Sequence, residues 1–265
     1  MRFASIASGS SGNCIYVGTE NTHILIDAGI SKKSIEAGLN GMDLSLKDID
    51  AILVTHEHSD HISGLGVVSR AYHIPIYSTK ETIECVKNNP HLGKIEEGLY
   101  YDILPDASFN IKDLEINPFS VSHDAANPVA YRVRNQDKSV AVATDMGIYD
   151  DYIIAHLEGV NGLLLEANHD VRMLEAGSYP YVLKRRILGE KGHLSNENSG
   201  RLLSRILHNN LNHVFLGHLS KENNYDMLAY ETVRLEINTA DNPYQADDFK
   251  IQVARRDTPS DIVEL

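Results

Sequence analysis

The sequence has few of the features that mark secreted, disulfide-rich or membrane proteins. Its 265 residues include two cysteines, Cys14 and Cys85, far apart in the chain, so neither a disulfide framework nor a Cys-x-x-Cys metal site is expected. No apolar run is long enough to cross a bilayer, and the first residues, MRFASIASGSSGN, lack the apolar stretch of a signal peptide. We therefore expect a cytoplasmic protein that is not inserted in a membrane.

Positive charge is also scarce. The 24 Lys and Arg residues are outnumbered by 37 Asp and Glu residues, which gives a formal net charge of −13. A broad basic surface that grips nucleic acid non-specifically is therefore not expected. A local nucleic-acid site is still compatible with this charge, because bound divalent cations would invert the local field.

Linkers and low-complexity segments are absent, so residues 1–265 are expected to form one domain. Apolar runs of strand length recur, with helical patterns between several of them, and this mixture predicts an α/β (α+β) fold. We expect a two-sheet sandwich with helices on its outer faces. In the helical pattern at 78–87, Ser78 and Glu81 have the spacing of a capping box. The strand-like runs are 14–18, 23–29, 51–56, 75–78, 114–123, 129–134, 140–145, 162–167, 213–218 and 249–254, and the helical patterns are 69–74, 78–87, 150–157, 179–188, 199–209 and 225–235.

Six of the strand-like runs end in an acidic residue or a histidine. Strand ends are rigid and project side chains from one edge of a sheet, so these residues are expected to share one site. One or two of them could simply be polar chain ends, whereas six, dominated by metal-ligating residue types, favour a site. They are Asp27, His56, His123, Asp145, Glu166 and His218.

The segment THEHSDH at 55–61 carries the most specific signal in the chain. His56 and His58 lie two residues apart directly after a buried strand, so they can face one cation. Asp60 and His61 follow a turn and can face a second cation. Imidazole and carboxylate ligands suit Zn²⁺, Mn²⁺ or Fe²⁺. Four such ligands within six residues predict two metal ions.

This motif resembles the H-x-H-x-D-H hallmark of the metallo-β-lactamase-fold hydrolases, and the remaining family positions follow in order along nearly the whole chain. The resemblance implies a four-layer αβ/βα sandwich with two divalent metal ions at one edge. By the same resemblance, His56, His58 and His123 would hold the first metal, and Asp60, His61 and His218 the second. Asp145 would bridge them, Asp60 would also serve catalysis, and Asp27 would orient the histidine loop through hydrogen bonds.

The other histidines have no place in the pattern. We interpret them as surface or hydrogen-bonded interior residues: His23, His73, His91, His156, His208 and His213. His169 is left open, because it lies near Glu166.

The four letters GHLS occur twice, at 192–195 and 217–220. The second copy follows a buried strand, as a metal ligand would, whereas the first follows the loop LGEKG, from which His193 can reach over the site. Ser195 and Ser220 are each expected to cap the helix that follows. The resemblance of the two copies is therefore interpreted as one local device used for two purposes.

Glu166 and His193 favour hydrolysis of a phosphodiester. A histidine at a helix N-terminus lies where phosphate binds well, and a carboxylate oriented on it would make it a proton donor for the leaving group. The pair resembles the catalytic pair of the tRNA 3′-processing and β-CASP nucleases in this fold. In the alternative interpretation, Glu166 is a plain strand-end acid and His193 a loop residue.

The Gly/Ser loop SGSSGN at 8–13, between the first two strands, offers a further candidate phosphate site. It could form a nest of N–H groups, although a hairpin turn is the simpler interpretation. The candidate phosphate contacts are Ser10, Ser11, Asn13 and Ser195. Basic residues near His193 could form a positive rim or could be idle surface charges. They are Lys184, Arg185, Arg186, Lys191, Arg201 and Arg205.

Stretches such as ASGSSGNC, ILIDAGIS, THEHSDHISGLG and LLLEANHD are similar to those of the YycJ (WalJ) group of bacterial nucleases. That resemblance implies a 5′-to-3′ exonuclease acting on DNA. Two other classes remain open: a small-molecule hydrolase of thioesters, lactones or lactams, which would not need the Glu166–His193 pair, and a non-catalytic protein that keeps the fold. The last would be expected to have lost ligands, and none is missing.

Overall fold

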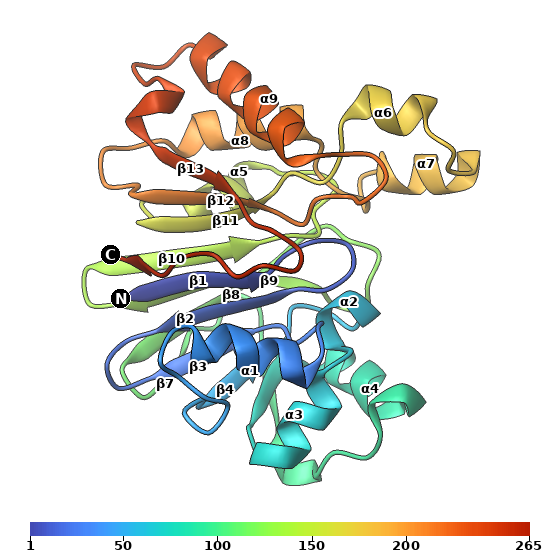
Figure 1. Ribbon diagram of the computed structural model, residues 1–265, viewed down its shortest axis with the longest axis vertical. Coiled ribbons are helices and arrows are strands. Elements are labelled where there is room, and N and C mark those ends of the chain that lie inside the picture. The colour runs from blue at the N-terminus through green and yellow to red at the C-terminus, as the bar shows by residue number, and fades with distance from the viewer.

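Two seven-stranded β-sheets pack face to face in the computed structural model, which describes residues 1–265 (Figure 1). In spatial order the first sheet contains β14 (Val263–Glu264), β1 (Arg2–Ala7), β2 (Cys14–Gly18), β3 (His23–Ile26), β4 (Ala51–Leu53), β5 (Ile76–Thr79) and β6 (Tyr100–Ile103). The second contains β13 (Lys250–Val253), β12 (His213–Gly217), β11 (Gly162–Glu166), β10 (Lys138–Ala143), β9 (Val129–Asn135), β8 (Leu114–Ser120) and β7 (Phe109–Ile111). Each sheet is mixed, with parallel pairing from β3 to β6 and from β10 to β13.

Helices cover the outer face of each sheet and complete the predicted four layers (Figure 1). The first sheet carries α1 (Lys32–Asn40), α2 (Ser59–Ile62), α3 (Leu65–Tyr72) and α4 (Lys80–Asn88), and the second carries α5 (Asp151–Leu157), α8 (Asn196–Ile206) and α9 (Asp226–Thr239). The segment with α6 (Val171–Ala176) and α7 (Tyr181–Ile187) stands out to one side of the second sheet. Short 3₁₀ turns span Pro90–Leu92, Glu97–Leu99 and Ala246–Asp248. The longest helix, α9, has 14 residues, and none of the helices has the length and apolar character that a bilayer span requires.

Alternation along the strands explains why the sheets are buried on both faces. In β3, Ile24 and Ile26 point into the core between the sheets, whereas Leu25 points into the core beneath the helices of the first sheet. In β11, Leu164 points between the sheets, whereas Leu163 and Leu165 face the helices of the second sheet. Successive side chains in a strand point to opposite faces, so a continuous apolar run fits a strand covered on both sides. The predicted sandwich is confirmed.

The ten predicted strand segments each overlap a strand, and the six helical patterns each overlap a helix. The remaining strands and α-helices, β1, β6, β7, β14, α1, α2 and α6, were not among these segments. The capping box at Ser78 and Glu81 is wrong. Ser78 is still part of β5 and donates to the Val54 carbonyl (2.7 Å), so helix α4 begins after Thr79 instead. Pairing of β5 with β6 continues through Thr79, which keeps Ser78 in extended backbone.

The parallel strands deliver their carboxyl ends to one edge of the sandwich. Strands β3 and β4 are parallel neighbours in the first sheet, and β10, β11 and β12 are parallel neighbours in the second. Strand β8 runs in the same direction as β10, because each is antiparallel to β9. The six acidic and histidine residues predicted at strand ends therefore meet at this edge.

Candidate metal centre and active-site cleft

A polar cleft of about 320 Å³ opens at this edge of the sandwich. Its walls include predicted site residues from both sheets together with side chains that the sequence did not point to. The larger cavities of the protein, about 490, 530 and 560 Å³, contain no histidine. The predicted residues that line the cleft are Ser10, His58, Asp60, His123, Asp145, His193 and His218.

One group of three histidines could hold a cation. His56 and His58 follow β4, and His123 follows β8, and one ring nitrogen from each lies within 4.8 Å of the others. His123 Nε2 faces His58 Nδ1 at 3.3 Å. His56 Nε2 is buried and makes no hydrogen bond. Three ring nitrogens turned toward one point, one of them unpartnered, fit a metal ion of the kind that imidazole binds.

A second group lies beside the first and contains Asp60, His61 and His218. Helix α2 places Asp60 and His61 on one turn, and His218 follows β12 directly. Asp60 Oδ2 lies 3.2 Å from His218 Nε2 and 3.4 Å from His61 Nε2. This group has the chemistry of a second cation site.

Asp145 lies between the two groups. Its Oδ2 is 3.2 Å from His61 Nε2, and its Oδ1 is 3.4 Å from His218 Nε2 and 3.6 Å from His123 Nε2. Asp145 Oδ2 is buried and makes no hydrogen bond, which a carboxylate waiting for a cation would explain. One carboxylate therefore reaches both groups.

Backbone strain marks three of these positions. Asp27, Asp145 and His218 have φ values of 62°, 60° and 54°, in the left-handed region that non-glycine residues seldom adopt. Each lies just past the end of a strand. A strained backbone of this kind costs of order 1 kcal/mol or more and persists where the surroundings hold a side chain in place for function.

Hydrogen bonds fix which nitrogen of each histidine faces the cluster. His61 Nδ1 donates to Asp27 Oδ2 (2.7 Å), and His123 Nδ1 donates to the Gly192 carbonyl (3.1 Å). The Thr55 hydroxyl donates its one hydrogen to Asp27 (2.9 Å) and so accepts from His56 Nδ1 (3.1 Å). All three rings therefore turn Nε2 toward the cluster, as metal-binding histidines do. Asp27 and Thr55 thus orient the histidine loop, and Thr55 is a residue that the sequence did not single out.

The electrostatics of the site also suit cations. Burial lowers the pKa of His56 and of His123, so both imidazoles are neutral at neutral pH, the form that binds metal. Burial opposes the charged forms of His61 and His218 as well, but neighbouring carboxylates outweigh it and raise both pKa values, that of His218 to about 10. The local potential is therefore negative, which also stabilises a divalent cation.

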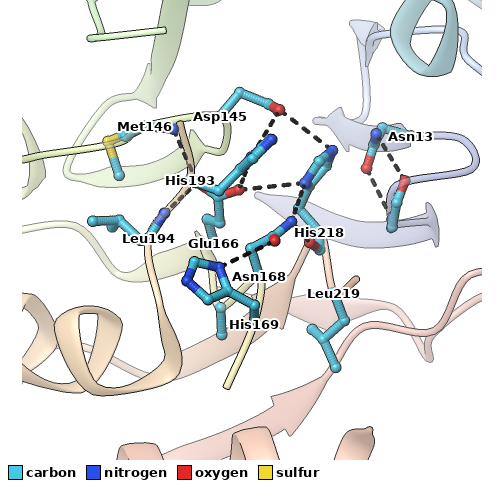
Figure 2. Close-up of polar contacts among 12 residues, drawn as sticks. Asn13, Asp145, Met146, Glu166, Asn168, His169, His193, Leu194, His218 and Leu219 are labelled. Carbon is cyan, nitrogen blue, oxygen red and sulfur yellow. Dashed lines mark hydrogen bonds and ion pairs between the residues drawn. The ribbon is translucent and has the colours of Figure 1, made fainter. Parts of the chain in front are cut away.

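Glu166 and His193 form the predicted pair. Glu166, at the end of β11, is fully buried, and its Oε1 accepts from His193 Nδ1 (2.7 Å) and lies 3.3 Å from His218 Nδ1 (Figure 2). Its Oε2 accepts from the backbone N–H groups of Met146 (2.9 Å) and Leu194 (3.2 Å). Burial raises the pKa of Glu166, but charge and hydrogen bonding from His193 outweigh it and lower the pKa to about 2. Glu166 is therefore a fixed carboxylate that touches both histidines of the GHLS segments.

The candidate phosphate contacts differ in where they lie. Ser10 lines the cleft, whereas Ser11 lines the separate cavity of about 530 Å³. Asn13 is buried, accepts from the Gly9 N–H (3.0 Å) and has its amide nitrogen 3.2 Å from His61 Nε2. Ser195 accepts from the Asn198 N–H (3.2 Å), so it caps α8 as predicted.

Ser220 does not cap a helix, contrary to prediction. It accepts from the Asn223 N–H (3.2 Å) in a turn, and α9 begins only at Asp226. The chain between these points turns back to bury Asn223 and Asn224, which delays the helix.

Of the six basic residues near His193, only Arg186 lines the cleft. Arg201 and Arg205, both on α8, form ion pairs with Glu236 (3.1 Å) and Asp151 (3.0 Å). Lys184 donates to the backbone carbonyls of residues 175 and 177. His169 is buried behind the site and hydrogen-bonds to Asn168, whose amide also donates to the His218 carbonyl (Figure 2). Asp124, Asn168 and Tyr179 line the cleft, and of these only Asp124 had a sequence signal, as the residue after His123.

The chain is similar to known proteins in sequence and in fold. The model of the Beta-lactamase superfamily domain matches residues 22–211. Exodeoxyribonuclease WalJ of Streptococcus pneumoniae is 40% identical over 264 residues, covering 100% of this chain and 98% of WalJ. Exodeoxyribonuclease YycJ of Bacillus anthracis is 39% identical over 235 residues, 88% of each chain.

Solved structures agree on the fold. The metallo-β-lactamase fold protein YhfI from Bacillus subtilis superposes with a TM-score of 0.70 at 17% identity, covering 98% of this chain and 99% of YhfI. The two-sheet sandwich, the edge that holds the histidine clusters and the full-length similarity to WalJ lead to one assignment. The chain belongs to the metallo-β-lactamase superfamily and, within it, to the family of the WalJ and YycJ proteins.

Proposed function

We propose that this protein is a two-metal phosphodiesterase that acts on DNA as an exonuclease, with 5′-to-3′ polarity. The observation that carries the phosphodiester chemistry is the buried Glu166–His193 pair beside the two ligand groups. The full-length similarity to two proteins named exodeoxyribonucleases supports DNA as the substrate. Because both sheets contribute to one cleft, we propose that residues 1–265 act as one domain. We also propose that the protein works in the cytoplasm, since its two cysteines form no disulfide.

The cluster divides into two metal sites in this proposal. His56, His58 and His123 would hold the first ion and Asp60, His61 and His218 the second, with the Asp145 carboxylate within reach of both groups. Zinc or manganese suits these ligands, with iron as a third option. When bound, the two ions supply the hydrolytic nucleophile and offset the negative charge that develops on the phosphate. Asp60, the ligand at the mouth of the cleft, also helps to place the attacking group.

His193 holds the proton that the leaving oxygen needs. Its Nδ1 donates to Glu166 Oε1, which fixes the orientation of the ring. Its Nε2 makes no hydrogen bond within the protein. Burial opposes the charged form of His193, but Glu166 outweighs it and raises its pKa, which keeps the imidazolium available near neutral pH. A proton at Nε2 can then pass to the departing alkoxide. Of the candidate phosphate contacts, Ser10 lines the cleft and is proposed to assist phosphate binding.

The test has two steps. Bound metal is first measured by mass spectrometry, with about two ions per chain expected. Metal-loaded protein is then assayed on 5′-phosphorylated and 5′-hydroxyl DNA and RNA, with thioester and lactam reporters alongside. His58→Ala should abolish cleavage, whereas His91→Ala, a change to an exposed histidine outside the cleft, should not. If the metal-loaded protein cleaves no nucleic acid, or turns over the reporters instead, the proposal is wrong.

A further inference from the structure

One wall of the cleft is formed by the α6–α7 segment, which contributes no strand to either sheet. Residues Tyr179, Leu183, Arg186 and Ile187, from the loop before α7 and from α7 itself, line the cleft. Helix α7 buries none of its residues, and it stands with α6 beside the sandwich (Figure 1). Because this segment adds little to the core, its contribution to the cleft calls for a functional explanation.

Arg186 is the single Lys or Arg side chain that lines the cleft, whereas three aspartates line it. Its Nε donates to Asp124 Oδ2, and no other hydrogen bond involves the guanidinium. Both terminal nitrogens are therefore left for a ligand. An arginine fork with two free N–H groups matches a phosphate and can bind it through two hydrogen bonds.

Asp124 holds this arginine in place. Its backbone N–H donates to the Lys191 carbonyl (3.1 Å), which ties it to the chain just before His193. Its Oδ1 makes no hydrogen bond and lies 3.5 Å from His123 Nε2. Asp124 thus connects Arg186 to the first ligand group. A partly exposed ion pair of this kind adds at most about 1 kcal/mol to stability, so positioning is the better explanation for it.

Tyr179 gives the same wall an aromatic surface. Its ring is half-buried, no hydrogen bond involves its hydroxyl, and it lines the cleft together with the apolar side chains of Leu183 and Ile187. Every nucleobase has a flat face that stacks on an aromatic ring without regard to sequence. The volume of about 320 Å³ suits a single nucleotide.

We propose that the α6–α7 segment is the substrate-end subsite. Arg186 binds the phosphate next to the scissile one, Tyr179 stacks on the base of the nucleotide that enters the cleft, and Asp124 positions Arg186. The substrate class is then a DNA end with one unpaired terminal nucleotide in the cleft, read by its backbone and not by its sequence. This inference rests on the proposed function, because it needs a nucleic-acid substrate in the cleft.

The test measures both binding and turnover with metal-loaded protein. Binding of a non-cleavable single-stranded oligonucleotide is followed over a range of salt concentrations, and kcat and KM are measured on its cleavable counterpart. Arg186→Ala should raise KM about 10-fold and make the slope of log Kd against log salt shallower by about 0.7, the effect of one lost phosphate contact. Arg186→Lys should raise KM less than Arg186→Ala does. Tyr179→Ala should raise KM several-fold, and Tyr179→Phe should resemble the unaltered protein.

Two further variants separate positioning from bulk charge. Asp124→Asn should raise KM less than Arg186→Ala and leave bound metal unchanged, as expected if it acts through the arginine. Arg172→Ala, which removes an exposed arginine from α6 that makes no ion pair, should change neither KM nor the salt slope.

The outcomes distinguish this inference from the proposed function. Cleavage by the unaltered protein with an unchanged KM and salt slope in Arg186→Ala, or an equal effect of Arg172→Ala, overturns the inference alone. Oligonucleotide binding that depends on Arg186 without any cleavage overturns the proposed function but supports the subsite. Absence of both binding and cleavage overturns both.

Discussion

The two GHLS segments share four residues but occupy different depths of the same site. In 217–220 the glycine ends β12, so His218 leaves a buried strand and is itself only 1% exposed. In 192–195 the glycine lies on a loop, and the side chain of His193 is 21% exposed. The element that precedes each copy therefore decides how deeply its histidine is buried in the site.

The two histidines also differ in how their backbones are held. His218 adopts a φ of 54° and its N–H donates to Ser8 Oγ (2.9 Å), which fixes it to the loop after β1. The His193 N–H donates to the Ile187 carbonyl (3.0 Å) in helix α7, which lines the cleft. We therefore expect the same four residues to place a metal ligand in one copy and a substrate contact in the other. Five substitutions test this difference, in order from the largest expected effect to the smallest.

His218→Ala should have the largest effect. It removes a ligand atom from the second group, so bound metal should fall by about one ion per chain and kcat/KM by about 10³-fold, since a metal contributes several kcal/mol to the transition state. Mass spectrometry and a DNA cleavage assay measure the two quantities, and circular dichroism checks that the variant folds. A folded variant that keeps both ions would show that the ligand role is misassigned.

His193→Ala should leave bound metal unchanged and reduce kcat by about 10²-fold, as for loss of a proton donor. The loss should shrink on a phosphodiester whose leaving group is already a stable anion, because such a group needs no proton. Rates on an ordinary and on a nitrophenyl ester provide the comparison. Equal losses on both substrates, or loss of metal, would contradict the role given to His193.

Glu166→Gln should affect both segments, because Glu166 Oε1 contacts both histidines. We expect kcat to fall by about 10- to 100-fold and metal affinity at the second site to weaken by about 10-fold, the range for residues that orient ligands. Metal titration and steady-state kinetics on one preparation measure the two effects. An effect confined to kcat would mean that Glu166 serves His193 alone.

Ser195→Ala and Ser220→Ala should have the smallest effects, and these effects are on stability. Ser195 caps α8, a helix of 11 residues, so its loss should cost about 1 kcal/mol and lower Tm by about 2–4 °C. Ser220 closes only a turn, so its loss should cost less. Thermal unfolding of the two variants ranks them, and the reverse order would contradict this account of the shared serine.

The strands of the sandwich could be predicted because their signal is local. A run such as LLLE at residues 163–166 is apolar on both faces and ends in a charge, which indicates a doubly buried strand with a functional end. The closely spaced residues His56, His58, Asp60 and His61 also predicted a metal site from residue type alone. Element boundaries were less accessible, as Ser78 shows: its capping pattern was overridden by pairing of β5 with β6.

The side chains that complete the cleft had almost no sequence signal. Tyr179 is an ordinary residue type at an unremarkable spacing, and it lines the cleft only because the α6–α7 segment folds beside the second sheet. Asp124 and Asn168 lie on the loops after β8 and β11, close to the strand-end residues His123 and Glu166. Thr55 is another example. Its type and position in the sequence do not indicate a role, and only the folded structure brings its hydroxyl into contact with Asp27 and His56.

The sequence by itself determined the strand pattern, the inventory of imidazole and carboxylate residues and the two histidines of the GHLS segments, of which only the first precedes a capping serine. Tertiary structure alone decided that Glu166 touches both of those histidines, that Asp145 spans both ligand groups and that Arg186 is the one arginine in the cleft. The physical reason is that ligand type and strand periodicity are properties of neighbouring residues. Distances between strand ends depend on how two separate sheets pack, which no local pattern encodes.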